Sequence, residues 1–277
     1  MTATDQRKAR TSKVFRSAVD SGRAALLERE ADSVAKSYGL RVPPSGLART
    51  EGELASLAKK LGFPLALKVA SRDVIHKSDI GGVVAGVTSL KDARSAYREI
   101  LHNVKAAKPR AVLSGVLVQK MAPKGNEFVV GGTRDPQFGP AVMFGLGGVY
   151  VELFRDVSFR LAPLIEEEAL EMVKQTKASR LMEGFRGSKP LDARAAAKAI
   201  VAVGDIMADH PDVDSIDVNP LFVYPHGALA VDVRVLMRES ASQRAGVVRA
   251  RAPGLAPRQR APRRPIVKSG GTENGVT

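Results

Sequence analysis

Two short polar stretches near the C-terminal end of the chain, SIDVNP and AVDVRV, have residue types and spacing that could bind a metal. Asp217 and Asn219 are two positions apart in a strand-like run, so both side chains leave the same face. A Pro-His-Gly turn follows, and the returning strand could place Asp232 opposite them. Carboxylate and amide oxygens suit Mg²⁺, which keeps water and phosphate oxygens as further ligands. The alternative is a solvated hairpin face, which the apolar neighbours disfavour.

Lys68 lies inside the apolar run LALKVAS. An ammonium group in such a strand is costly to desolvate unless an anion is supplied. Lys68 could therefore be a phosphate ligand that acts as a point charge. The alternative is a lysine at a strand edge that reaches solvent, and the residue taken alone does not separate the two.

A second cluster, HKSD followed by Gly81-Gly82, comes directly after this strand. A histidine in a loop is usually a surface residue, but an imidazole can also attack phosphorus and form a phosphohistidine. The glycines would let main-chain N–H groups approach an anion, which favours the second interpretation for His76. The GLGG run at 145–148 could supply backbone N–H donors for an oxyanion or phosphate, or it could form a tight bend between strands. The pattern alone favours the bend.

The remaining histidines, His102, His210 and His226, lack the spacing of metal ligands and are predicted to lie on the surface or in loops. The chain has no cysteine, which excludes disulfides and thiolate chemistry. We expect a cytoplasmic protein, because no apolar run approaches membrane-spanning length and the N-terminus lacks a secretory apolar core.

Hydrophobic periodicity predicts the elements that must position these residues. Expected helices are 23–38, 51–61, 92–105, 166–177 and 192–209. Expected strands are 64–71, 83–88, 112–120, 126–134, 141–146, 213–224 and 228–235. Strands and helices alternate without a regular βαβ rhythm, so the fold class is α+β, with two sheet-containing subdomains.

The two ends of the chain differ from this folded part. Residues 1–22 are polar and are predicted to be flexible. Residues 238–277 contain nine basic and two acidic residues, so they supply half of the net charge of +14. This segment has too few large apolar residues to offset its ordering entropy, and we expect a disordered basic tail. A solvated tail is favoured over one that binds nucleic acid.

Four separated motifs resemble one known family. The stretches LALKVASRDVIHKSDIGGV, GVLVQKMAPKGNEFVVGGTRDPQFGPAVMFGLGGVYVELFRDVSFRLAPL, LMEGFRG and IDVNPLFVYPHGALAVDVRVL closely resemble the ATP-grasp (beta) part of ADP-forming acetate–CoA ligases. They are more distantly similar to the beta subunit of succinyl-CoA synthetase. The resemblance covers roughly residues 25–237. It implies an ATP-grasp domain at 23–237, with subdomains at about 40–120 and 121–237 that clasp a nucleotide.

The resemblance also implies roles for individual residues. Lys68 would bind the ATP phosphates, Asn219 and Asp232 would be magnesium ligands, and Asp217 would lie close to the metal. His76 would carry the phosphoryl group, with Arg160 as an additional phosphate contact. The further residues implied are the adenine hinge, formed by Gln119, Lys120 and Met121, and Glu127 near the nucleotide.

The reaction implied is acyl-CoA + phosphate + ADP ⇌ carboxylic acid + CoA + ATP, with ATP or ADP and Mg²⁺ bound by this chain. In fused members a CoA-binding domain and a ligase domain precede the ATP-grasp region, and the basic tail matches nothing in the family. We therefore expect a partner, a CoA-binding alpha-type subunit that also binds the small-molecule acid. Two alternatives stay open: another ATP-grasp ligase that joins a carboxylate to an amine, and a non-catalytic nucleotide-binding module.

Overall fold

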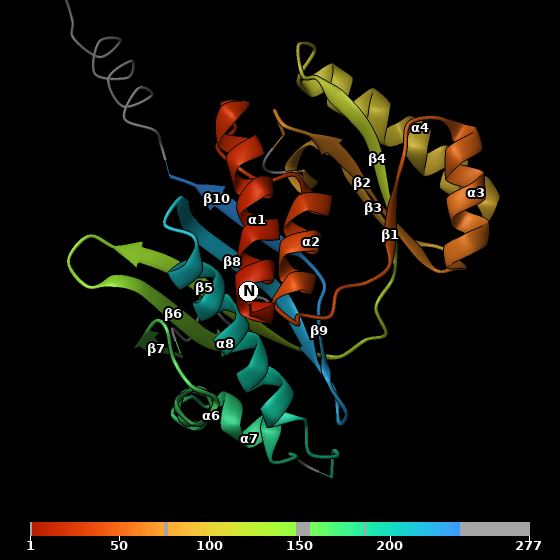
Figure 1. Cartoon of the computed structure of the whole chain (residues 1–277). Helices are drawn as coiled ribbons and strands as arrows, with labels where there is room; N and C mark the ends of the chain where they lie inside the picture. The colour runs from red at the N-terminus through yellow and green to blue at the C-terminus, as the bar shows by residue number, and fades with distance from the viewer. Residues whose placement is uncertain (1, 75–76, 148–155, 186, 239–277) are drawn as a thin grey trace, which may run out of the picture. The chain divides into compact units, whose positions relative to one another are not determined.

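The computed structural model describes residues 2–74, 77–147, 156–185 and 187–238. They form two antiparallel sheets with helices packed on them (Figure 1). The helices are α1 (Ala3–Asp20), α2 (Glu28–Ser37), α3 (Glu51–Leu61), α4 (Leu90–Ala107), α6 (Glu166–Lys174), α7 (Ala178–Met182) and α8 (Ala193–Asp209). The strands are β1 (Ser45–Ala48), β2 (Leu65–Ser71), β3 (Val83–Val87), β4 (Leu113–Lys120), β5 (Asn126–Asp135), β6 (Gly139–Leu146), β7 (Val157–Leu161), β8 (Val213–Val223), β9 (Ala228–Ala230) and β10 (Val233–Met237), and a 3-10 turn, η1, spans Ser78–Ile80.

The smaller sheet has the strand order β1-β4-β2-β3, and α3 and α4 pack on one of its faces. Burial alternates strictly along β2, so Leu65, Leu67 and Val69 point into this core. Helix α4 supplies Ile100 and Val104 to the same cluster, at the spacing of one helical face. Lys68 therefore points to the opposite face of β2, away from this core.

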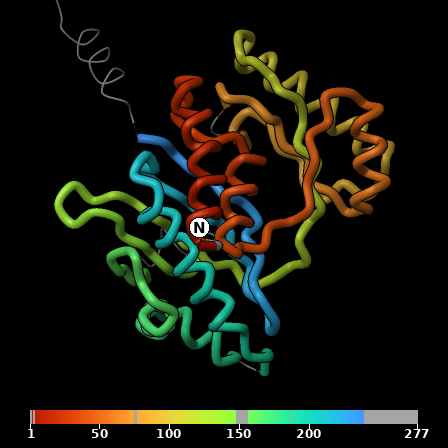
Figure 2. The backbone as a smooth tube through the Cα atoms, in the orientation of Figure 1, coloured from red at the N-terminus to blue at the C-terminus, as the bar shows by residue number. Residues whose placement is uncertain are grey.

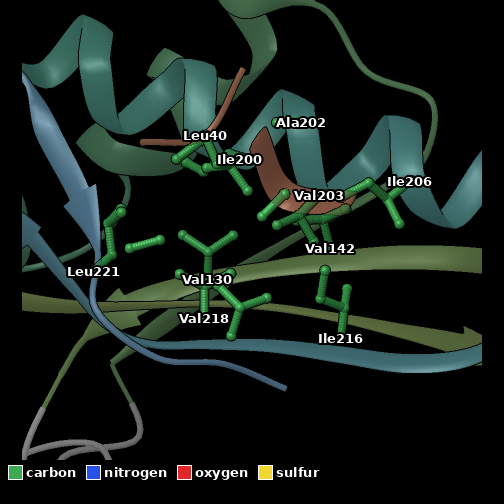
Figure 3. Close-up of a cluster of buried hydrophobic side chains, with 14 of the residues drawn as sticks. Leu40, Val130, Val142, Ile200, Ala202, Val203, Ile206, Ile216, Val218 and Leu221 are labelled. Atoms are coloured by element: carbon green, nitrogen blue, oxygen red, sulfur yellow. The ribbon is translucent and has the colours of Figure 1, made fainter. Parts of the chain in front are cut away.

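The larger sheet has the order β10-β8-β5-β6-β7, with β9 also paired to β8. Helix α8 lies across one face, where Ile200, Val203 and Ile206 pack against Val130 and Val218 (Figure 3). Gly132 lets the helix approach closely, because a Cβ built there would lie 2.7 Å from Ile216 Cγ2 and 2.8 Å from Met207 Cγ. The part of this face under α8 is apolar, and Asp217 and Asn219 of β8 lie on the opposite face.

Residues 3–20 form helix α1, so the structure does not support the flexible stretch predicted at 1–22. Helix α1 opens with a capping box at Thr2 and Asp5. It buries Phe15 and Ala18 in the apolar cluster of the larger sheet. In Figure 2 helix α1 runs beside elements from the C-terminal half of the chain. Its apolar residues share one hydrophobic cluster with residues of β8 and β10. The apolar stripe of α1 is short and its mean polarity is high, which is why composition alone suggested a loose segment.

Helix α1 also covers His210, which the sequence placed on the surface or in a loop and which follows the end of α8. His210 is buried, and its Nε2 lies 2.9 Å from both Thr11 Oγ1 and Tyr38 Oη. The Thr11 hydroxyl donates to the Arg7 carbonyl and the Tyr38 hydroxyl donates to Asp209. Nε2 therefore lies within hydrogen-bond distance of two hydroxyls, and the tautomer of the ring sets which of them donates. This histidine is a packed, hydrogen-bonded core residue.

Most expected elements differ by a few residues in their bounds, and two of them differ in a way that shapes the site. The helix expected at 23–38 begins only at Glu28, because residues 24–26 instead pair with β10. There the Leu26 N–H donates to the Val235 carbonyl at 3.0 Å. The strand expected at 228–235 is interrupted between β9 and β10, at Val231 and Asp232. Strands β1 and β7 were not expected. Within the described residues, none of the helices has the length and apolarity to cross a bilayer.

Candidate active site

A cavity of about 430 Å³ contains side chains from both sheets. Its floor on the smaller sheet is the outer face of β2 and β4, and its other wall is formed by β8, β10 and the start of α2. The sequence-predicted residues among its lining are Lys68, Gln119, Lys120, Met121, Asn219 and Asp232. Residues that are far apart in the sequence thus meet in one concave site.

Lys68 projects from β2 into this cavity. Its Nζ lies 2.9 Å from Glu28 Oε1 and 3.2 Å from Asp232 Oδ1. Burial by itself would lower the pKa of Lys68, but the Glu28 and Asp232 carboxylates outweigh it and raise the pKa. The ammonium therefore stays charged at neutral pH, as a phosphate ligand must. The alternative of a lysine that reaches open solvent does not fit, because only 13% of its side chain is exposed.

The strand pairing of β8 places Asn219 opposite Asp232. The Asn219 N–H donates to the Asp232 carbonyl at 3.1 Å, between the β8–β9 and β8–β10 pairings. On its other side β8 has an irregular register with β5 between Phe128 and Val130, next to Asn219. Such bulges re-aim side chains and are common beside functional sites. Both side chains line the cavity.

Asp217 lies on the same outer face of β8, two residues before Asn219. It pairs with Arg234 of β10 in the strand register. Its carboxyl is half-buried, and burial together with the nearby Asp232 raises its pKa, while Arg234 opposes that rise. Asp217 borders the site without lining the cavity.

The β4 end forms the third part of the site. Gln119 is buried, and its amide lies 3.5 Å from the Val231 carbonyl. Lys120 donates from Nζ to the Phe63 carbonyl at 2.6 Å, so its charge is held at the rim of the cavity by a backbone acceptor. The Met121 N–H donates to the Pro64 carbonyl at 3.1 Å. These bonds hold the start of the segment that connects the two sheets against the residues that precede β2.

The structure does not bring two other predicted residues into the cavity lining. Glu127 is exposed on β5, although its cross-strand partner Phe222 lines the cavity. Arg160 pairs in register with Val142, whose side chain is buried on the inner face of the sheet. Its guanidinium donates to Gln175 Oε1 at 2.9 Å. Arg160 therefore points to the helix-covered face, opposite to Asp217, which argues against its role as a phosphate contact.

His76 lies outside the described residues, as does Gly148 of the GLGG run. The residues that follow His76 are described, and Lys77 and Ser78 line the cavity. Gly147 packs directly on backbone, since a Cβ there would lie 2.9 Å from the Phe128 nitrogen. This close approach to a neighbouring strand is a structural use of that glycine.

Sequence reasoning missed two acids that the fold brings to the site. Glu28 contacts Lys68 and also forms an ion pair with Lys77. Asp32, one helical turn later, is buried; desolvation and the neighbouring Glu28 raise its pKa to about 6, against the effect of Lys68. Glu28 lies in the first turn of α2, where acids are common because they complement the helix dipole. Nothing in the local pattern therefore separates Glu28 from an ordinary acid at a helix start, or Asp32 from an ordinary polar residue of a helix.

The donor set fits a magnesium ion that also binds phosphate. Among the described residues, no three His, Asp or Glu side chains gather into a cage for a metal. Mg²⁺ is commonly held by one or two protein oxygens, with water and substrate phosphates as the other ligands. Asn219 and Asp232 supply such a pair beside Lys68, and 38% of the Asp232 side chain is exposed.

Two antiparallel sheets line one cavity, in which a lysine faces an oxygen-donor hairpin, and this arrangement places the chain in the ATP-grasp class. The ATP-grasp domain family model matches residues 17–237. The chain is 46% identical over 212 residues to the beta subunit of acetate–CoA ligase [ADP-forming] I from Pyrococcus furiosus, covering 76% of this chain and 91% of that subunit. It is 48% identical to acetate–CoA ligase [ADP-forming] I of Archaeoglobus fulgidus, over 74% of this chain and only 30% of that longer protein.

Solved structures agree. The dinucleotide-forming acetyl-coenzyme A synthetase 1 of Candidatus Korarchaeum cryptofilum, in complex with coenzyme A and Ca-AMPCP, matches with a TM-score of 0.79 and 47% identity, over 82% of this chain and 99% of that one. A second structure of that enzyme, with Mg-AMPPCP and a phosphohistidine segment pointing towards the nucleotide site, matches with a TM-score of 0.73 and 43% identity, over 82% and 100% of the two chains. The chain belongs to the family of the ADP-forming acetate–CoA ligase beta subunits. It is the ATP-grasp component of an ADP-forming acyl-CoA synthetase, as its motifs predicted.

Proposed function

We propose that this chain transfers a phosphoryl group between a nucleotide in the cavity and His76, within the reaction acyl-CoA + phosphate + ADP ⇌ carboxylic acid + CoA + ATP. The observation that carries the proposal is the convergence of Lys68, Asn219 and Asp232 in one cavity beside the connection between the two sheets. The relatives named above are beta subunits or longer proteins, which supports a shared reaction with other polypeptide parts.

Each residue has a role that follows from its chemistry. Lys68 binds the phosphates as a point charge and offsets the negative charge that moves with the phosphoryl group. Asn219 and Asp232 hold Mg²⁺ by side-chain oxygens. The bound ion would neutralise phosphate oxygens and align them for transfer. The hinge residues Gln119 and Met121 border the adenine, and Asp217 stands behind the metal ligands as an acidic neighbour.

In the direction of ATP use, a ring nitrogen of His76 attacks the terminal phosphorus and forms a phosphorus–nitrogen bond while the bond to the ADP oxygen breaks. The attacking nitrogen must be unprotonated, which an ordinary histidine with a pKa near 6.5 satisfies at neutral pH. The reverse step forms ATP from ADP. We assign Glu127 a place near the nucleotide on resemblance alone.

The other half of the reaction requires groups on a partner. We propose an alpha-type subunit that binds coenzyme A and the small-molecule acid and exchanges the phosphoryl group with His76. Subunit naming in the relatives supports a multi-subunit arrangement. We assign the ATP-grasp domain to 23–237, with subdomains at about 40–120 and 121–237. The hydrophobic cluster of the smaller sheet, from Ala48 to Val118, supports the first subdomain, whereas residues 15–42 contribute to the cluster of the larger sheet.

The direct test is transfer of label from γ-labelled ATP with Mg²⁺ to the purified chain, with and without a candidate alpha subunit. Phosphohistidine is acid-labile and base-stable, and we expect that label in the wild type and in His226→Asn, whose side chain is exposed. His76→Asn should not be labelled. A carboxylate–amine ligase would need no such intermediate, and a binding module would bind ATP without labelling. Absence of label in the wild type under every partner condition would contradict the proposal.

A further inference from the structure

Two lysines of the cavity share one buried carboxylate. Glu28 Oε1 lies 2.9 Å from Lys68 Nζ, and Glu28 Oε2 forms an ion pair with Lys77 Nζ. Lys68 comes from β2, and Lys77 from the segment between β2 and β3. Neither the ATP-grasp motifs nor the roles proposed above include Glu28.

The charged side chains of this cluster differ in how much of them is exposed. The exposed fraction of the side chain is 7% for Glu28, 13% for Lys68, 23% for Lys77 and 38% for Asp232. The Glu28 side chain is thus the least exposed of the four, and it lines the same cavity as Lys68 and Lys77. Its two oxygens each contact one of the two ammonium groups.

The backbone around Glu28 explains its fixed position. Residues 24–26 pair with β10, so the start of α2 is registered against the strand that follows Asp232. The following turn of α2 buries Ala31 and Val34 in the cluster of the larger sheet, whereas Lys68 belongs to the smaller sheet. Glu28, whose helix packs on the larger sheet, therefore contacts cations that belong to the smaller sheet. Lys68 and Lys77 outweigh the burial of Glu28 and lower its pKa, which keeps it ionised.

We propose that Glu28 is a positioning residue for phosphate binding: it holds the Lys68 and Lys77 ammonium groups side by side, facing the cavity, so that both meet the nucleotide phosphates. Two adjacent cations repel each other without a shared anion, and long flexible lysines lose entropy when each must be ordered separately. A buried carboxylate that supports a phosphate-binding lysine has the same physical logic as the strand lysine–helix glutamate ion pair of protein kinases. This inference rests on the proposed nucleotide site.

The test compares Glu28→Gln with Glu30→Gln by calorimetry. Glu30 lies on the same helix and pairs with Arg23, so its substitution makes the same charge change outside the cavity lining. We expect Glu28→Gln to raise the Kd for ATP by at least about tenfold, with adenosine, which has no phosphate, bound as in the wild type. Glu30→Gln should bind both as the wild type does. Tighter ATP binding by Glu28→Gln would make Glu28 a competitor of phosphate and would overturn the proposal, as would an unchanged Kd.

Lys77→Gln provides the second arm. It should also weaken ATP and spare adenosine, and the double variant Glu28→Gln/Lys77→Gln should lose less than the product of the two single losses, because both disrupt one arrangement. Strict multiplication of the two effects would overturn the shared role. If Glu28→Gln does not fold, Lys77→Gln decides by itself, and an unchanged ATP Kd overturns the proposal. Failure of the wild type to bind ATP would instead remove the nucleotide site, so the two failures are distinguishable.

Discussion

Asn219 and Asp232 face each other across the hairpin, joined by a backbone hydrogen bond of 3.1 Å from the Asn219 N–H to the Asp232 carbonyl. This pairing fixes the separation of an amide and a carboxylate at the edge of the cavity. Because antiparallel neighbours in one register have adjacent side chains on one face, both oxygens can reach a single ion. The backbone of the hairpin thus sets the separation of the two residues proposed as magnesium ligands.

Asp232→Ala should therefore remove most of the magnesium dependence of nucleotide binding. We expect the Kd for ATP in the presence of Mg²⁺ to rise by at least about tenfold, by loss of one of the two protein oxygens. Without Mg²⁺ the variant should bind ATP no more weakly than the wild type, since Asp232 also neutralises Lys68. Calorimetry with and without Mg²⁺ measures both, with Asp214→Ala, an exposed β8 residue, as control. An unaltered response to Mg²⁺ would exclude Asp232 as a ligand.

Arg160→Gln should leave ATP binding within about twofold of the wild type, the range expected for a surface change away from a site. The reason is its register with Val142, which directs Arg160 to the helix-covered face where it bonds Gln175. Lys68→Gln measured in parallel should abolish detectable binding. A loss of affinity in Arg160→Gln comparable to that of Lys68→Gln would restore the phosphate contact suggested by the sequence.

His210 should make the folded state less stable as the pH falls from about 7 to 4. Burial lowers the pKa of His210 to about 4, against the effect of Asp209, whereas the unfolded chain titrates near 6.5. Between these values the unfolded state binds the proton and the native state does not, so the free energy of unfolding decreases with decreasing pH. The size of the contribution is about 3 kcal/mol across the window.

Denaturant titrations of the wild type and His210→Gln at several pH values measure this effect. The variant should be less stable at pH 7.5 but show a flatter pH dependence, and the exposed His226→Gln should follow the wild type. Asp32 acts in the opposite direction, because its raised pKa of about 6 favours the protonated native state at low pH. Because the two groups oppose each other, the pH dependence of each variant must be compared with that of the wild type. Identical slopes of the free energy of unfolding against pH for His210→Gln and the wild type would contradict the lowered pKa of His210.

Gly132→Ala should destabilise the fold by about 1–3 kcal/mol, the usual effect of overpacking a core. Its Cβ would meet Ile216 Cγ2, Met207 Cγ and Val203 Cγ1 at 2.7, 2.8 and 3.0 Å. Gly139→Ala, at an open turn between β5 and β6, should be strained only by its positive φ of 83°. Thermal unfolding in the same buffer compares the two, and an increase in Tm for Gly132→Ala would contradict close packing of α8 on the sheet.

The sequence by itself determined the parts of this protein that depend on local order. The apolar run around Lys68 predicted a strand, and the two-residue spacing of Asp217 and Asn219 with a turn behind them predicted the hairpin that meets Asp232. Periodicity and chain reversal act over a few residues, so both can be read directly from the chain.

Only the tertiary structure decided the contacts between distant segments. Glu28 and Lys68 are forty residues apart, and their meeting depends on residues 24–26 pairing with β10 at the other end of the domain. Arg160 alternates in its strand as its neighbours do, yet the face that it occupies follows from the register of β7 with β6. Helix α1 is polar for most of its length, and its order comes from Phe15 and Thr11 meeting His210. A local sequence pattern cannot predict such long-range packing, because the partner of each residue lies elsewhere in the chain.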